Sequence, residues 1–347
     1  MKIYEITIKP QSGFGTPLKG DTIFGHFCWQ IAHDEKLIGK SVDALLADYQ
    51  TKPFAIFSSA YPRFSVGERH YYALKTPSLP PDVMFNLPGD KKQKIKKRKD
   101  YKAKKWMIIE NNRRFSSLKE PELKYRTDQE LLDDLEACLS DEARRHVRRV
   151  GGKKIVAVLN QFHNTINRRT GTTGLEGFAP FSVEQQIFFP ETALALFVGI
   201  DESALTIEQI RAGLERIGSF GFGKDASTGL GRFTVEEACG IDFAKMGSDM
   251  PNACYTLAPC VPEIDTFSDR YFTPFTRFGR HGDVLAKSGN PFKNPIIMAD
   301  EGGIFMPKNK EVFNKPYIGR AITNISKAEP KSVAQGYSLY IPVKVEV

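Results

Sequence analysis

The sequence predicts an α+β fold, and three stretches of the 347-residue chain carry that prediction. Residues 4–9 alternate apolar and polar side chains, which is the two-residue period of a strand with one apolar face. Residues 207–217 instead repeat apolar side chains at helical spacing, and residues 337–347 return to a near-perfect alternation. Strand and helix patterns therefore occur in the same chain.

The N-terminal part predicts a strand followed by a helix. A turn rich in Gly and Pro occupies residues 11–20, and Asp21 is placed to cap the helix behind it. The apolar residues of that helix recur at helical spacing: Ile23, Phe24, Phe27, Cys28 and Ile31. Further along, Thr127 and Glu130 match a capping box, which predicts a second helix that runs to about His146.

Residues 187–236 contain the clearest supersecondary unit. An apolar strand at 193–200 precedes a capping box of Thr206 and Gln209, and the helix behind it ends at Gly218. A glycine-rich loop and another strand follow. This unit is half of a split βαβ motif, and the N-terminal strand and helix begin the other half, so the economical interpretation is a ferredoxin-like sandwich.

Composition changes near residues 239–252, which contain turn residues and little periodicity. We therefore expect two domains. Residues 1–238 would form a ferredoxin-like domain with insertions. Residues 239–347 would form a β-rich, ferredoxin-like domain that ends in the alternating strand.

One short segment accounts for the positive charge. The run Lys91–Lys105 holds ten Lys and Arg against one acid, Asp100, so it contributes +9 to a net charge of +8, and the other residues sum to −1. Such a run on a near-neutral body indicates contact with a polyanion, and a solvated, mobile loop is the alternative. Residues 53–125 around it predict short strands that bracket an extended, partly disordered excursion.

Composition also excludes several classes of protein. Five Cys, without CxxC or Cys/His pairs at zinc-finger spacing, indicate neither a disulfide framework nor a zinc site, and a reducing cytoplasm fits best. The chain has no N-terminal apolar leader and no long unbroken apolar stretch, so we expect no signal peptide and no membrane contact. We predict no metal and no cofactor.

The sharpest local motif is the glycine loop, residues 221–233, GFGKDASTGLGRF. Glycines allow backbone amides to approach a phosphate, and Lys224 and Arg232 complement its charge. A dinucleotide site fails on context, because that fingerprint follows a strand and opens a helix, whereas this loop follows a helix and enters a strand. A plain glycine-rich turn is the alternative.

Two further patterns bear on nucleic-acid chemistry. Residues 144–154 and 160–173 combine cations with Asn and Thr, which suits contacts to a nucleic-acid backbone, and a solvated helix end is the alternative. His26 and His33 lie on one stripe of the first helix, where a ribonuclease-style acid or base would fit. Solvated histidines are the better interpretation, since neither has an evident partner nucleophile.

Taken in order, these motifs resemble the RAMP-type subunit four of the Csm complex, the type III-A CRISPR-Cas effector, in the Cas-five-like group. The segments that carry the resemblance are 16–29 (TPLKGDTIFGHFCW), 164–173 (NTINRRTGTT), 221–233, 298–307 (MADEGGIFMP), 317–322 (YIGRAI) and 335–343 (QGYSLYIPV). The resemblance implies tandem ferredoxin-like RAMP domains and a non-catalytic RNA-binding subunit for antiviral defence. That subunit would hold the 5′ repeat-derived handle of the crRNA and contact the large Cas-ten-type subunit and the backbone RAMP subunit.

The resemblance also implies the RNA-binding residues. Those of the glycine loop, which would cradle handle phosphates, are Gly221, Gly223, Lys224, Ser227, Gly229, Gly231 and Arg232. Lys19 and Asp21 would lie beside the loop, and Asn167 with Arg168 matches an Asn-rich basic segment. The basic run matches no motif of the family. The enzyme alternative is a Cas-six-like endoribonuclease that processes guide RNA precursors, with His26 as its candidate base.

Overall fold

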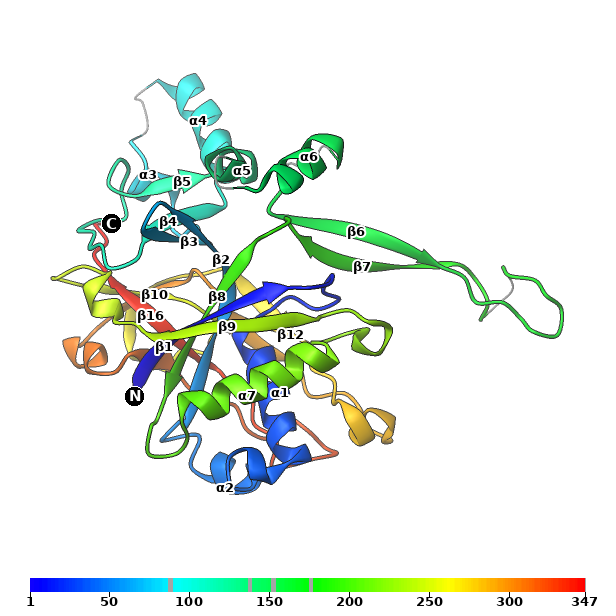
Figure 1. The fold of residues 1–347 in the computed structure, drawn as a ribbon. Coiled ribbons are helices and arrows are strands. Elements are labelled where there is room, and N and C mark those ends of the chain that lie inside the picture. The colour runs from blue at the N-terminus through cyan, green and yellow to red at the C-terminus, as the bar shows by residue number, and fades with distance from the viewer. Residues whose placement is uncertain (87–89, 137–138, 151–153, 175–176, 347) are drawn as a thin grey trace.

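A seven-stranded antiparallel sheet organises the first 240 residues of the computed structural model, which describes residues 1–86, 90–136, 139–150, 154–174 and 177–346 (Figure 1). Its strands lie in the order β5 (Lys124–Arg126), β4 (Trp106–Glu110), β3 (Arg69–Lys75), β2 (Ala55–Val66), β8 (Ala193–Ile200), β1 (Lys2–Pro10) and β9 (Phe233–Gly240).

Four of these strands and two helices form a ferredoxin-like unit. Along the chain the order is β1, α1 (Gly20–His33), β2, β8, α7 (Ile207–Phe220) and β9, and in space the strands lie in the order β2, β8, β1, β9. The two helices lie side by side on the sheet (Figure 1), and α1 packs its Phe27 ring 5.4 Å from that of Phe57 on β2. The split βαβ prediction is therefore confirmed.

Two of the predicted helix caps are confirmed and one is wrong. Thr206 and Gln209 form the reciprocal capping box at the start of α7, and Thr127 with Glu130 does the same at α5 (Asp128–Glu136). Asp21 does not cap α1, which begins at Gly20. Its carboxylate instead binds the guanidinium of Arg277, a stronger charge-assisted contact than a neutral amide offers.

A long insertion, residues 67–192, separates β2 from β8. It carries β3, β4 and β5, four helices, and a two-stranded hairpin that projects from the body (Figure 1). The helices are α3 (Pro81–Met84), α4 (Lys91–Ala103), α5 and α6 (Asp141–Val150), and the hairpin strands are β6 (Val156–His163) and β7 (Phe181–Phe188). The single helix predicted to run to His146 is thus two helices, since the Ser140 hydroxyl caps a new one; Cys138, between them, lies outside the described residues.

The structure corrects the extended excursion predicted around the basic run. Residues 91–103 form the helix α4, because Lys, Arg and Gln are good helix formers and Asp90 caps the first turn by accepting a bond from the amide of Gln93. Asp82 pairs with Arg98 (2.8 Å) and holds this helix to α3. Stacked rings of Phe85 and Tyr101, with centroids 3.8 Å apart, add an apolar contact.

The C-terminal part is rich in strands, as predicted. Its five-stranded antiparallel sheet has the order β11 (Phe267–Tyr271), β14 (Ile304–Pro307), β10 (Ala253–Thr256), β16 (Tyr337–Val343) and β15 (Tyr317–Gly319), and β12 (Pro274–Arg277) pairs with β13 (Ile296–Ala299). After β9, the only helices among the described residues are the short 3-10 turns 243–245, 283–287 and 310–314. The remaining helices of the described residues are α2 (Val42–Ala47) and the 3-10 turns 35–37 and 226–228.

The two sheets share one hydrophobic core. Leu339 and Ile341 of β16 belong to the same buried cluster as Ile56 on β2. The buried side chain of Gln335 also bonds to both the amide (2.9 Å) and the carbonyl (2.7 Å) of Phe57. Because this core is continuous, the domain division at residue 239 stays a prediction. None of the described helices is long and apolar enough to cross a membrane.

Candidate nucleic-acid interface

The glycine loop folds onto the segment between β1 and α1, residues 11–19, which we call the β1–α1 loop. Its amides donate to that segment and to α1: Gly223 N to His26 Nε2 (3.2 Å), Lys224 N to Thr16 Oγ1 (2.9 Å), Gly231 N to Gly13 O (2.7 Å) and Arg232 N to Ser12 Oγ (2.9 Å). These amides are therefore committed to protein acceptors. The predicted cradle, in which glycine amides bind phosphates, is therefore not formed by these amides.

The glycines instead allow the loop to close on itself. Gly231 has φ 74°, and a Cβ there would overlap the backbone N, C and O of Phe222, whose amide donates to the Gly231 carbonyl (2.9 Å). Gly229 also has a positive φ, 99°, but a Cβ there would meet nothing within 4 Å. Gly231 is thus needed for close backbone approach, and Gly229 only for its left-handed conformation.

The outward groups of the loop are cations and free donors. Lys224, Ser227 and Arg232 are exposed. Among the loop residues that the structure describes, the amides of Asp225, Ala226 and Ser227 have no protein acceptor; they start the 3-10 turn 226–228, and Asp225 is left-handed. Successive free amides beside a left-handed residue form a nest, which binds anions.

His26 supports this loop and is not placed as a base. Its Nε2 accepts the Gly223 amide proton, and its ring lies 4.6 Å from that of Phe222. Burial lowers the pKa of His26 to about 4, so the ring is neutral at pH 7 with its proton on Nδ1. His33, on the same helix, pairs with Asp283 (2.8 Å). An endoribonuclease would need a free acceptor nitrogen on His26 as its base, but Nε2 already accepts the Gly223 amide proton.

Lys19 and Asp21 lie at the contact between the two halves of the chain. Lys19 pairs with Asp300 and with Glu301 (2.9 Å), and Asp21 binds Arg277 bidentately at 2.6 and 2.8 Å. Their side chains are only 15% and 6% exposed, so both charges are neutralised within the protein. Burial raises the pKa of Glu301. The pKa of Asp300 is lowered despite its burial, first by a hydrogen bond with Glu301 and then by the neighbouring lysines.

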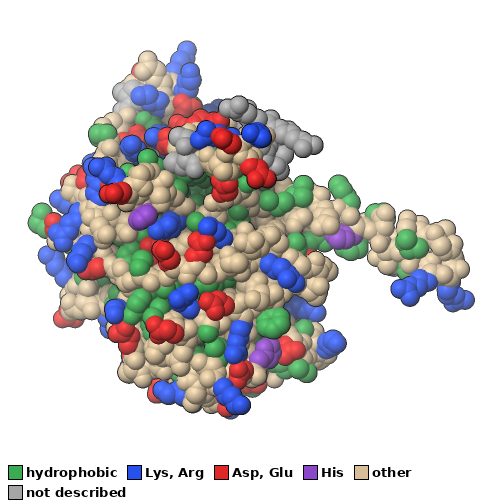
Figure 2. Space-filling view, viewed as in Figure 1, with side chains coloured by type: hydrophobic (Ala, Val, Ile, Leu, Met, Phe, Trp, Pro, Cys, Tyr) green, Lys and Arg blue, Asp and Glu red, His purple; other side chains and the backbone are tan. Residues whose placement is uncertain are grey.

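The hairpin begins beside the glycine loop and carries Asn167 and Arg168 away from it. At its base, Phe14 exchanges two backbone bonds of 2.8 Å with Gln186, and its ring meets Phe188 edge-on at 5.6 Å. Asn167 and Arg168 lie in the turn at the far end, where Figure 2 shows basic side chains. The structure therefore does not bring these two residues to the loop.

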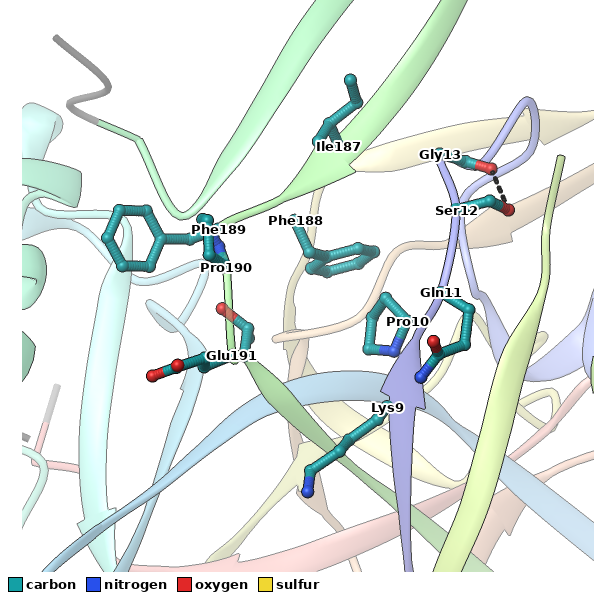
Figure 3. A pocket seen from close by; sticks show the side chains of 11 residues that line it. Lys9, Pro10, Gln11, Ser12, Gly13, Ile187, Phe188, Phe189, Pro190 and Glu191 are labelled. Carbon is teal, nitrogen blue, oxygen red and sulfur yellow. Dashed lines mark hydrogen bonds between the residues drawn. The ribbon is translucent and has the colours of Figure 1, made fainter. Parts of the chain in front are cut away.

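A pocket of about 380 Å³ opens where the hairpin meets the body. Figure 3 shows Phe188 facing Pro10 across it, with Gln11 and Ser12 on the β1 side and Glu191 on the other. Ser12 joins this pocket to the glycine loop, because its hydroxyl accepts the Arg232 amide proton. In the sequence, residues 11–20 indicate only a turn. The sequence signal that could have identified Ser12 and Thr16 is that both are small hydroxyl residues just ahead of a helix.

The fold and the loop together define a class of protein. A ferredoxin-like unit with a glycine loop between its second helix and last strand, joined to a second antiparallel sheet, is the RAMP-type tandem fold. No protein-family model matches the chain, and no curated protein matches its sequence.

Solved structures match this fold, and these neighbours are Csm4 chains. One comes from a Csm3-Csm4 subcomplex in the type III-A CRISPR-Cas interference complex; it is 14% identical over 99% of this chain and 100% of its own, with a TM-score of 0.51. Two come from Csm1-Csm4 cassettes. The one in complex with AMPPNP is 15% identical over 100% of both chains, and the one with cA3 is 16% identical over 100% of this chain and 99% of its own; both have a TM-score of 0.50. Identities this low establish the fold alone.

Proposed function

We propose that this chain is a cytoplasmic, non-catalytic RNA-binding subunit of a type III-A CRISPR-Cas (Csm) effector complex. In this role it holds the 5′ repeat-derived handle of the crRNA. It also links the large subunit to the backbone subunit. The proposal is supported by the outward donors of the glycine loop, and by the complexes that proteins of the same fold form with Csm1 and with Csm3.

The glycine loop has the chemistry for a phosphate backbone. Lys224 and Arg232 supply exposed positive charge, and the free amides of residues 225–227 supply directed hydrogen bonds. Such groups position a single strand without reading its bases. The neutral, occupied His26 favours binding over cleavage. Asn167 and Arg168 then form a second contact at the end of the hairpin.

The hairpin has the character of an interaction arm. Val158 and Phe162 on β6 are 58% and 82% exposed, and β7 exposes Phe181 by 50%. Both faces of this two-stranded element lack a covering layer among the described residues (Figure 1). Val158 and Phe162 lie on one face of the hairpin, and Phe181, which pairs with His163, lies on the other. Exposed apolar side chains mark interaction sites, so we place a partner subunit or the guide strand along the hairpin.

The test is binding of the purified full chain to labelled RNAs with an intact or scrambled 5′ handle, across a salt series. The variant K224A/R232A removes the two outward cations, and K40A/K310A, two exposed lysines elsewhere, is the matched control. For a single strand, each lost phosphate contact lowers the salt slope by about 0.7. We therefore expect K224A/R232A to lower the slope by about 1.4 and the control to leave it unchanged.

Gels run in parallel score cleavage of a repeat hairpin. Handle-dependent binding without cleavage supports the proposal. Equal slopes for the wild type and K224A/R232A would remove the glycine loop from the RNA site, and specific cleavage that is lost in His26→Ala would replace the binding subunit with the endoribonuclease.

A further inference from the structure

A second pocket, which we call the α4 pocket, lies between the end of α4 and the β1–α1 loop. Its volume is about 470 Å³, a size typical of small-molecule sites. Five lysines line it: Lys19, Lys75, Lys102, Lys104 and Lys105. Only two carboxylates, Asp128 and Glu301, do so. Charge therefore favours an anionic occupant.

The walls of the α4 pocket also offer flat apolar surfaces. Trp106, Tyr61 and Phe188 line it, and the Trp106 indole donates to Asp128 (2.7 Å), which fixes the ring. The Tyr61 hydroxyl donates to the carbonyl of Leu257. Cations and aromatic faces together match a nucleotide, with its phosphate and base.

Not all five lysines are available to a ligand. Lys19 and Lys75 share the acidic pair of residues 300 and 301, and Lys104 binds Glu120 (2.8 Å). Lys102 is exposed and has no carboxylate within 4 Å among the described residues. Lys105 is 61% exposed, although its partner Asp128 is only 15% exposed, so the ammonium group can also meet a phosphate from the solvent side. The available charge thus lies at the α4 side of the pocket.

The helix α4 continues this charge away from the pocket. Its residues 94, 98 and 101 face the body, through Asp82 and the ring of Phe85. Two positions before each of these residues stands a lysine: Lys92, Lys96 and Lys99. Two positions correspond to about 200° around a helix, so these lysines lie on the side that faces away from the body. All three are exposed, and no carboxylate lies within 4 Å of them in the described structure. Figure 2 shows basic side chains over this helix.

The other side of the α4 pocket leads to the glycine loop. Pro17 and Leu18 line the pocket, and their neighbour Thr16 accepts the amide proton of Lys224. The glycine loop, the α4 pocket and the free face of α4 are therefore consecutive along the surface. A strand held at Lys224 reaches the pocket across three residues of the β1–α1 loop.

We infer that the α4 pocket binds one nucleotide of a single-stranded RNA, and that Lys92, Lys96 and Lys99 bind the phosphates beyond it. This inference rests on the proposed RNA-binding function and assigns the strand a path past the glycine loop. A lipid surface fits less well, because α4 has no apolar stripe to insert: Tyr101 is stacked on Phe85, and Ile95 stands alone.

The test uses the full chain and an RNA in which the handle is followed by a single-stranded tract. The variant K92A/K96A/K99A is compared with K40A/K287A/K310A, three exposed lysines elsewhere, so that both lose the same charge. We expect the first to lower the salt slope by about 2 and the second to leave it unchanged. In a Trp29→Phe background, Trp106 is the only tryptophan, so stacking of a base on it quenches the remaining fluorescence.

The outcomes separate this inference from the function on which it rests. The path over α4 is wrong if K92A/K96A/K99A keeps the wild-type salt slope and RNA leaves the Trp106 fluorescence unchanged. If K224A/R232A weakens RNA binding in the same experiments, the glycine-loop site is still supported. If the wild type binds no RNA, both are wrong. If K92A/K96A/K99A loses binding to phosphatidylserine vesicles while its RNA slope is unchanged, α4 is a membrane contact and the inference is overturned.

Discussion

Gly231→Ala tests whether the glycines of the loop act by close packing. At Gly229, Ala costs only the left-handed conformation, about 1–2 kcal/mol, because the space around it is open. At Gly231 the same cost applies, and the new Cβ also overlaps the backbone of Phe222. The two backbone bonds of Gly231, to Phe222 and Gly13, must then break, at about 1 kcal/mol each. We expect a total loss of about 3–4 kcal/mol for Gly231→Ala.

Thermal unfolding followed by intrinsic fluorescence measures this difference. At about 2.1 cal/mol/K per residue, each kcal/mol lowers the Tm of a 347-residue chain by about 1.4 °C. Gly229→Ala should therefore lower the Tm by about 1.5–3 °C and Gly231→Ala by about 4–6 °C. Equal shifts for the two variants would refute the argument, since both positions share a positive φ and differ only in what surrounds them.

Two further predictions concern residues around the loop. Burial holds the pKa of His26 at about 4, below its usual 6.5. The stabilisation from the neutral ring is therefore complete above pH 6.5 and is lost as the pH falls to about 4. The free energy of unfolding should drop by about 3 kcal/mol over this range. His26→Gln keeps an acceptor for Gly223, so its Tm should fall less between pH 7 and pH 4 than that of the wild type or of the control His33→Gln; identical pH profiles would contradict this. Asp21→Asn should lower the free energy of unfolding by about 2 kcal/mol, because it weakens the bidentate ion pair with Arg277. A double-mutant cycle with Arg277→Gln should give a coupling energy above about 1 kcal/mol. Additive effects would mean that the pair does not contribute to stability.

The parts of the fold that the sequence predicted are those set by local patterns. The strand around Ile6 and the reciprocal cap of Thr206 and Gln209 are predicted from neighbours a few residues apart, and the structure has both. The polar side of that strand is nevertheless buried, since Glu5 is 2% and Thr7 5% exposed. The helix at 91–103 also had a local signal in Asp90 and Gln93, but its repeated positive charge led to the expectation of an extended segment. Contacts made by Asp82 and Phe85 stabilise that helix, and no periodicity within the run reveals them.

The site was harder to predict because its partners are distant in sequence. The glycine loop itself is evident in the sequence, but its acceptors Ser12 and Thr16 lie more than 200 positions earlier. The family resemblance implies that Lys19 and Asp21 lie beside the RNA-binding loop, whereas in the fold their side chains pair with acids and an arginine of the C-terminal half. Which charges remain free is decided by pairing in space.

The insertion between β2 and β8 makes the molecule modular. It leaves and rejoins the sheet at adjacent points, since Arg63 and Ala193 are register partners. Closing a longer loop between fixed ends costs little, about 0.6 kcal/mol for each doubling of its length. The basic helix α4 and the projecting hairpin can therefore differ in length while the four central strands stay unchanged, whereas β3 and β4, whose Tyr72, Leu74 and Met107 lie in the shared core, must be kept. Diversification of binding partners needs no redesign of the scaffold.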